Sequence, residues 1–173
     1  NRGAKSQPDP HRHLPFAQDR RGLAAHEAAA LARVFVIQRH AEEVLGQDAV
    51  VKGRVRPAAI GAHQPFGQVP WLTDGEISVF ESGACLLYLG EKSAKLLPTD
   101  TKARVEAVEW LIAGLNSMEM VTVPWSIHQF SNDRQGAAWE RTDGWLTTRL
   151  THLEKVIGKR DWLAGSFSIA DIL

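Results

Sequence analysis

Residues 66–91 read FGQVPWLTDGEISVFESGACLLYLGE, and this stretch carries the clearest structural pattern in the chain. Residues 69–72 and 77–80 have the composition of short strands, and Asp74-Gly75 between them favours a tight turn. Ser82 is a favoured helix N-cap, and the apolar run after it predicts a helix to about Lys92. That run contains Ala84, Cys85, Leu86, Leu87 and Leu89. The stretch therefore predicts a β-hairpin followed at once by a helix.

This arrangement brings two groups of polar backbone atoms to one edge of the predicted hairpin. The loop that contains Pro70 leads into the first strand, and the helix that starts near Ser82 follows the second strand. The first N–H groups of a helix lack intrahelical partners, and the helix N-terminus attracts carboxylates. The pattern thus predicts a binding site for a peptide-like anion.

These residues resemble the glutathione transferase family, in its bacterial type. In that family a Val-Pro pair and a Glu-Ser pair, separated by a β-hairpin, form the glutathione-binding half of a thioredoxin-like domain. The resemblance implies that Pro70 is cis, so that the Val69 backbone faces the cysteinyl part of glutathione. It also implies that Glu81 and Ser82 hold the γ-glutamyl carboxylate. Gln68 is a candidate for the glycyl carboxylate.

The resemblance implies an α/β fold plus an all-α part: an incomplete or divergent thioredoxin-like half-domain, then a helical glutathione-transferase C-terminal domain. Residues 61–97 would form the glutathione-binding half and residues 98–173 the helical domain. Asp100 is a good N-cap for a helix to about Met120, and Pro124 predicts a bend or a stop. A further helix is predicted over residues 136–157, with Trp139, Leu146, Leu150, Leu153 and Ile157 on one face.

The upstream third, residues 1–60, matches the family poorly and is left unassigned. Residues 1–22 show no periodic apolar face and are expected to be irregular, whereas apolar spacing predicts a helix over residues 23–45 and a short strand near residues 49–51. All six tryptophans and the single cysteine lie after residue 70, and the first 66 residues are rich in Ala, Arg and His. Two explanations remain open: an upstream segment read out of frame or replaced, and simple divergence.

The C-terminal segment carries a second specific signal. Ser168 and Asp171 have the spacing of a capping box, in which the acid reaches back to the N-cap backbone. In the glutathione transferase family this box opens a buried helix at the centre of the second domain. The chain ends at Leu173, one turn into that helix, so we expect a C-terminally truncated chain that is less stable than a complete member.

The catalytic residue is not identifiable from the sequence. The family mechanism uses a Ser, Cys or Tyr near the start of the first helix to stabilise the glutathione thiolate, which is the nucleophile. Ser6 is the only serine before Ser78, and it follows no credible strand. Cys85 and Tyr88 fall within the predicted helix after the hairpin, where packing is the expected role. By resemblance, Asn116 and Met118 would line the electrophile pocket.

Composition limits the other classes of function. The chain has 173 residues, a formal net charge of zero and one cysteine, which fit a cytoplasmic protein without an internal disulfide. Neither the charge balance nor the longest apolar run argues for a nucleic-acid or membrane partner. The pair His11 and His13 has no partner cluster, so no metal site is expected.

Together these observations predict a glutathione transferase-like protein that binds glutathione as co-substrate and conjugates or reduces small hydrophobic electrophiles, as in detoxification. The resemblance implies a homodimer. Two alternatives remain: a non-catalytic transferase-like module used in protein assembly, and an inactive truncated or frameshifted product.

Overall fold

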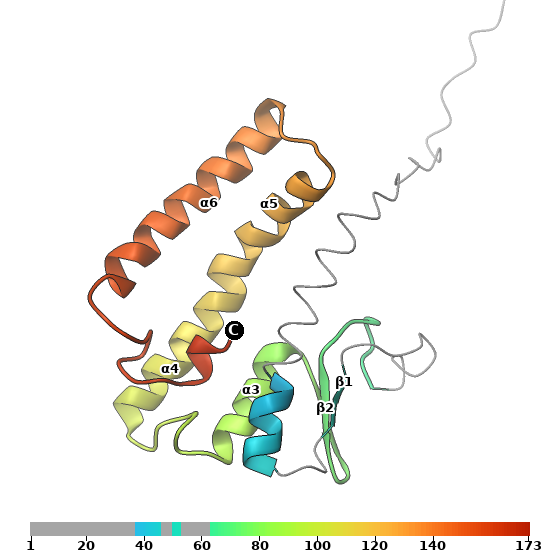
Figure 1. The fold of residues 1–173 in the computed structure, drawn as a ribbon, viewed down its shortest axis with the longest axis vertical. Helices are drawn as coiled ribbons and strands as arrows, with labels where there is room; N and C mark the ends of the chain where they lie inside the picture. Colours follow the sequence, from blue (N-terminus) through green and yellow to red (C-terminus); the bar gives the residue numbers. More distant parts are fainter. Residues whose placement is uncertain (1–36, 46–49, 53–62) are drawn as a thin grey trace, which may run out of the picture.

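The computed structural model describes residues 37–45, 50–52 and 63–173, with the backbone alone described for residues 50–52. Figure 1 shows a small sheet with helices packed at its side, followed by long helices that extend away from it. This arrangement confirms the predicted fold class, a small mixed half followed by an all-helical part. The interpretation of residues 1–36 as irregular chain and the start of a helix lies outside the described residues.

Three antiparallel strands form the sheet, in the order β1-β2-β3. They are β1 (Val50–Lys52), β2 (Trp71–Asp74) and β3 (Ile77–Phe80). The β2–β3 register pairs Trp71 with Phe80 and Asp74 with Ile77, so Gly75 and Glu76 alone form the turn. Gly75 has a φ of 57°, a conformation that glycine adopts without steric cost. The predicted hairpin is confirmed.

Helix α3 (Ser82–Glu91) packs against the sheet through the apolar run predicted from the sequence. Cys85, Leu86 and Leu89 are fully buried there together with Leu72 of β2. Residues 37–45 form a second helix, which contributes Ile37 and Ala41 to the same core. The described end of the predicted 23–45 helix therefore packs with the half-domain that it precedes.

Helix α4 (Thr101–Ala113) starts as predicted, because the Asp100 side chain accepts a hydrogen bond of 3.0 Å from the Ala103 N–H. The predictions of a helix end near Met120 and of a stop at Pro124 are wrong. A π-helical segment, η1 (Gly114–Glu119), connects α4 to α5 (Met120–Phe130), and Pro124 lies inside α5. Proline removes only one i→i−4 hydrogen bond, and tertiary packing of the flanking turns tolerates that loss.

Helix α6 (Gly136–Ile157) has the predicted bounds and runs back along α5 (Figure 1). The indole Nε1 of Trp125 donates a 2.8 Å hydrogen bond to Asp143, which fixes the two helices relative to each other. Of the predicted apolar face of α6, Leu146 is buried, whereas Leu150 and Ile157 are exposed. Much of this face is therefore uncovered in the structure.

The C-terminal segment returns to the first half of the molecule. The short helix η2 (Ile169–Asp171) has the predicted capping box: Asp171 accepts a 2.9 Å hydrogen bond from the Ser168 N–H, and the Ser168 hydroxyl accepts one of 3.3 Å from Ala170. The Ile169 N–H donates to the Leu96 carbonyl at 2.8 Å, and the Ile169 side chain is fully buried. The segment thus joins the two halves into one core.

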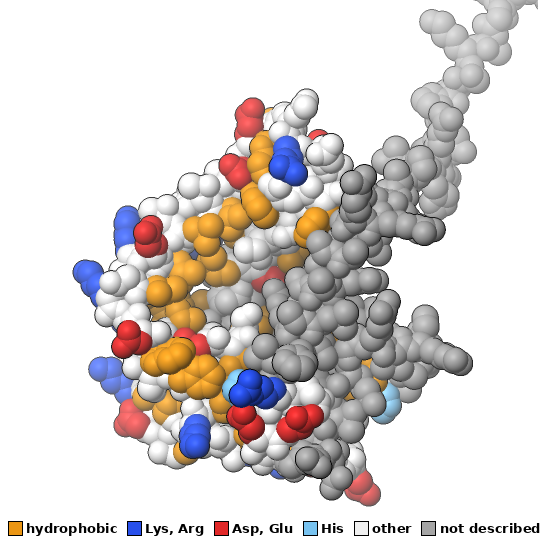
Figure 2. Space-filling model, in the orientation of Figure 1, with side chains coloured by type: hydrophobic (Ala, Val, Ile, Leu, Met, Phe, Trp, Pro, Cys, Tyr) orange, Lys and Arg blue, Asp and Glu red, His pale blue; other side chains and the backbone are white. Residues whose placement is uncertain are grey.

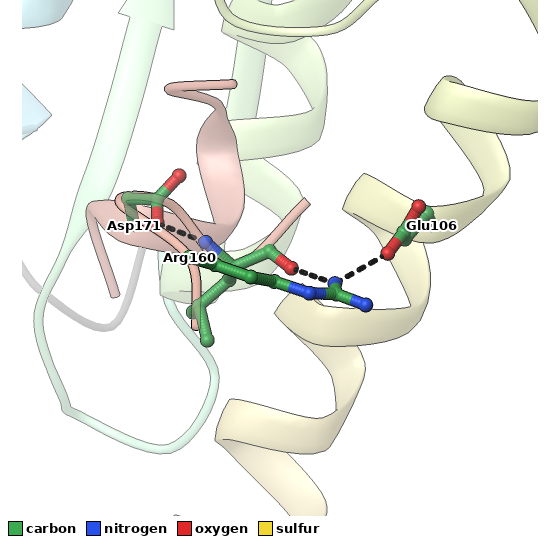
Figure 3. A network of polar contacts seen from close by, with 4 residues as sticks. Glu106, Arg160 and Asp171 are labelled. Atoms are coloured by element: carbon green, nitrogen blue, oxygen red, sulfur yellow. Dashed lines mark hydrogen bonds and ion pairs between the residues drawn. The ribbon is translucent and has the colours of Figure 1, made fainter. Parts of the chain in front are cut away.

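A polar network fixes the segment that leads to this capping box (Figure 3). The Arg160 guanidinium donates to Glu106 of α4 at 2.7 Å and to the Leu163 carbonyl at 2.9 Å. The Leu163 N–H in turn donates to Asp171 at 2.9 Å. Asp171 therefore serves both the capping box and the loop before it. The network spans the α6–η2 connection.

Close packing at Gly90 generates a stability prediction. A Cβ atom there would lie 2.9 Å from Leu97 Cβ and 3.2 Å from Ile169 Cγ2. Overpacking should make Gly90→Ala less stable by about 1–3 kcal/mol, as measured by urea denaturation.

The matched control is Gly144→Ala in the middle of α6, where a Cβ would meet no atom within 4 Å. This variant should gain about 0.5–1 kcal/mol, because alanine favours the helix over glycine. Equal stability of the two variants would contradict the close contact at Gly90.

Candidate functional site

The β2–β3 register brings the two sequence motifs together. Val69-Pro70 directly precedes Trp71, and Glu81-Ser82 directly follows Phe80. Since Trp71 and Phe80 are paired, both motifs leave the sheet at the same end of the hairpin. Directly opposite residues of an antiparallel pair have Cα atoms roughly 4.5–5.5 Å apart. The predicted juxtaposition of the loop and the helix N-terminus is therefore present.

The loop before β2 is held by a buried glutamine that the sequence interpretation missed. Gln64 is 2% exposed, and its side-chain oxygen accepts hydrogen bonds from the N–H of Phe66 at 2.6 Å and of Gln68 at 3.1 Å. Its carbonyl also accepts from the Gly67 N–H at 3.2 Å. The Val69–Pro70 peptide bond is cis, and Pro70 is buried. Pro65 and Gly67, which follow Gln64 closely, are the residues in the sequence that indicate an organised turn here.

An aromatic contact closes the same loop from outside. The His63 ring stacks on Trp71 with a centroid distance of 5.5 Å and an interplanar angle of 7°. Its Nδ1 lies 3.3 Å from the Ser78 hydroxyl on β3. The residue that begins the loop is therefore tied to both strands of the hairpin.

The second motif differs from the prediction in one respect. Ser82 is not the N-cap of α3: it is the first helical residue, and Glu81 is the N-cap, without a capping bond from its side chain. Glu81 has φ 71° and ψ 131°, because one residue must turn the chain directly from β3 into the helix. Such sparsely populated backbone costs on the order of 1–3 kcal/mol and clusters at binding sites.

The N-terminus of α3 presents backbone N–H groups beside the loop that have no acceptor within the helix. The first intrahelical bond of α3 runs from the Cys85 N–H to the Glu81 carbonyl at 2.9 Å. The N–H groups of Ser82, Gly83 and Ala84 accordingly have no acceptor within the helix. Gln68 and Glu81 are exposed, and Val69 and Ser82 are half-buried. The five predicted site residues thus lie around one edge, with polar groups suited to a peptide-like anion.

Cys85 and Tyr88 have packing roles in the structure. Cys85 is fully buried, and burial raises the pKa of its thiol to about 12. The Tyr88 hydroxyl donates a 2.6 Å hydrogen bond to Asp74, the last residue of β2 before the hairpin turn. Neither group is placed to activate a thiol at the α3 N-terminus. Ser6 lies outside the described residues.

Tyr88 belongs to a small network that ties the hairpin turn to the end of α3. The Lys92 ammonium lies 3.2 Å from the Asp74 carboxylate and 4.9 Å from the centre of the Tyr88 ring. The hydrogen bond from Tyr88, with that from Lys92, lowers the pKa of Asp74 below its usual value. Tyr88 and Asp74 in turn raise the pKa of Lys92 above its usual value. The turn is thus anchored at the end of the hairpin away from the candidate site.

A separate cavity of about 490 Å³ lies in the helical part. Figure 2 shows hydrophobic side chains gathered between α6 and the α4–α5 pair, continuing toward the segment after α6. Met118 lines the cavity, whereas Asn116 does not belong to its lining. Polar lining residues are Ser117, Glu119, Thr122, Arg149 and His152. None of the five predicted glutathione-site residues contributes to this cavity.

Two further properties concern only the part of the chain that the structure describes. Within residues 37–45, 50–52 and 63–173, no group of three or more His, Cys, Asp or Glu side chains is arranged to hold a metal ion. None of the helices described there is long and apolar enough to cross a bilayer.

Two curated relatives illustrate what the chain is similar to, although no family model matches it. The disulfide-bond oxidoreductase YfcG of Escherichia coli is 32% identical over 142 residues, which cover 69% of this chain and 60% of YfcG. Glutathione S-transferase F14 of Arabidopsis thaliana is 33% identical over 118 residues, covering 62% of this chain and 46% of that protein. The chain spans less than two thirds of the length of either relative.

Solved structures share the fold. A glutathione transferase from Burkholderia graminis, with two glutathione molecules bound per subunit, superposes with a TM-score of 0.67 at 24% identity, covering 81% of this chain and 65% of that one. A glutathione transferase family member from Pseudomonas fluorescens, with two glutathione bound, gives 0.65 at 24% identity, with coverages of 82% and 67%. The superposed 81% and 82% of this chain are both longer than residues 61–173. The common fold therefore extends upstream of the glutathione-binding half.

The fold and the edge formed by the two motifs define a thioredoxin-like half joined to a helical region. Together with the distant relatives, this fold shows that the chain belongs to the glutathione transferase family. Bacterial glutathione transferases are among the similar solved structures.

The Asp74 network makes a pH prediction for the unfolding temperature. Because the pKa of Asp74 is lower in the folded chain, its stabilising effect is present above the ordinary value of 3.8 and is lost as pH falls through the lower folded value. Asp74→Asn should therefore unfold at a lower temperature than wild type at neutral pH, and the difference should vanish in acid. Glu76→Gln, at an exposed position of the adjacent turn, is the control. A temperature difference for Asp74→Asn that persists unchanged to the lowest pH would contradict the network.

Proposed function

We propose that this chain binds glutathione at the edge formed by Gln68, Val69, Pro70, Glu81 and Ser82. With that co-substrate it would conjugate or reduce small electrophiles. The single observation that carries the proposal is the pairing of Trp71 with Phe80, which places both motifs at one end of the hairpin. The glutathione molecules in the similar solved structures support the choice of ligand.

Each end of a glutathione molecule has a suitable partner at this edge. Its γ-glutamyl carboxylate would be bound by the Ser82 hydroxyl and the first N–H groups of α3, which have no acceptor within the helix. The Glu81 carboxylate would pair with the amino group at the same end of the peptide. The backbone of Val69 would face the cysteinyl unit, and the exposed Gln68 amide would meet the glycyl carboxylate. The ligand would thus lie across the edge, from the helix to the loop.

The reaction itself requires a thiolate and a group that stabilises it. We assign no residue to that role, because Cys85 is buried with a raised pKa and Tyr88 is bonded to Asp74. Similarity to both a disulfide-bond oxidoreductase and a glutathione S-transferase supports conjugation and reduction as the two reactions to test. A cytoplasmic location, in a reducing compartment, belongs to the proposal.

We expect retention on immobilised glutathione and its loss in Ser82→Ala. Removing a hydrogen bond to a charged group costs about 1.5–3 kcal/mol, so calorimetry should show affinity weakened by roughly 10- to 100-fold. Ser131→Ala, at the exposed C-cap of α5, is the control that should bind like wild type. A wild-type chain that flows straight through the column would overturn the proposal.

Turnover then separates an enzyme from a binding module. The protein is mixed with glutathione and an aromatic halide, and in a parallel assay with glutathione and a small disulfide. Product formation in either assay supports the catalytic reading. Retention on glutathione without turnover in both assays would favour the non-catalytic assembly module instead.

The proposal includes a homodimer. Phe66, beside the glutathione edge, is 71% exposed, more than any other large hydrophobic side chain among the described residues. Buried aromatic anchors carry much of the energy of protein interfaces. In sedimentation experiments the wild-type chain should form dimers and Phe66→Ser should shift them toward monomers. Ile157→Ser, at the end of α6, is the control. A monomeric wild-type chain would contradict this part of the proposal.

A further inference from the structure

Two polar side chains are buried in the described part of the chain, Gln64 and Ser168. Buried polar groups lose hydrogen bonds to water and need partners inside the protein. Ser168 finds such partners in the capping box. Gln64 finds its partners in the loop that leads to Pro70, where its side-chain oxygen accepts hydrogen bonds from main-chain N–H groups.

The side-chain oxygen of Gln64 acts as a common acceptor for the loop backbone. It accepts from the Phe66 N–H at 2.6 Å and from the Gln68 N–H at 3.1 Å. The Gly67 N–H between them bonds to the main-chain carbonyl of Gln64 at 3.2 Å. Three successive N–H groups are therefore directed at one residue, and the loop winds around its side chain.

This winding fixes the residues that follow. Gly67 takes a φ of 68°, which turns the chain toward Gln68 and the cis bond between Val69 and Pro70. On the outer side, His63 is stacked on Trp71. Both ends of the loop are thus anchored at the hairpin, and Gln64 braces its interior.

We infer that Gln64 is a positioning residue for glutathione: it holds the backbone of Gln68 and Val69 in the conformation that meets the ligand. This inference rests on the proposed function of the same edge. Gln64 acts through the loop, because its side-chain oxygen is occupied by loop N–H groups and the residue is buried.

Two substitutions at Gln64 separate its acceptor from its bulk. Gln64→Met keeps the length of the side chain and removes the amide oxygen, which leaves two backbone donors without a partner. Gln64→Asn keeps an amide oxygen, and asparagine bonds readily to the N–H two residues further on. Gln135→Met, at the exposed start of α6, is the control for the exchange of glutamine for methionine elsewhere.

Hydrogen exchange of the ligand-free protein tests the bracing directly. In wild type the amides of Phe66 and Gln68 should exchange slowly for an exposed loop, since exchange requires the hydrogen bonds to open. Gln64→Met should accelerate both by at least about tenfold, whereas Gln64→Asn should preserve the protection of Phe66. Amides of α6, measured in the same samples, report whether the variant is folded. Unchanged rates at Phe66 and Gln68 in Gln64→Met would overturn the inference.

Glutathione calorimetry tests the consequence for the site. Gln64→Met should weaken glutathione binding by about tenfold or more, with Gln64→Asn restoring most of the affinity and Gln135→Met leaving it unchanged. Wild-type affinity in Gln64→Met would overturn the positioning role. If the wild-type chain does not bind glutathione, the proposed function fails and the glutathione role of Gln64 fails with it. The exchange rates then still decide whether Gln64 holds the loop.

Discussion

The pairing of Trp71 with Phe80 is the constraint on which the candidate site depends. It fixes where the loop enters the sheet and where the chain leaves it, so that one residue, Glu81, must complete the turn into α3 with a positive φ. A slip of one residue in this register would move every side chain of β3 to the opposite face and separate the two motifs. The rest of the half-domain stabilises this register: the core beneath it through Leu72, and the turn through Asp74.

Local signals in the sequence predicted the elements that local chemistry determines. The Asp74-Gly75 turn, the N-cap at Asp100 and the capping box of Ser168 and Asp171 each depend on residues within about four positions of one another. The bounds of α6 followed from its apolar period and the glycine after it. That the two site motifs lie close together was predictable as well, because a two-residue hairpin allows only one register of its strands.

Other features could not be predicted because they depend on contacts distant in sequence. Pro124 lies inside a helix that packing against α6 stabilises, and the proline alone indicates the opposite. Ser82 has the composition of an N-cap, but the strand ends so close to it that Glu81 takes that position. Gln64 appears polar and loop-like in the sequence, and only its burial shows that it serves the backbone. The cavity lining comes from residues more than thirty positions apart, on α4 and α6.

The π-helical segment between α4 and α5 has a consequence for the geometry of the long helices. A regular α-helix turns by about 100° per residue, so the wider π turn changes the rotational phase of everything that follows it. Near its start Leu115 lies so close to α3 that a Cβ atom added at Gly83 would be 2.6 Å from Leu115 Cδ1, and beyond its end Trp125 donates a hydrogen bond to Asp143 of α6. A one-residue deletion or insertion within residues 114–119 would rotate α5 about its axis relative to α4. The two contacts could then no longer form together. Chain length here is therefore as constrained as side-chain identity.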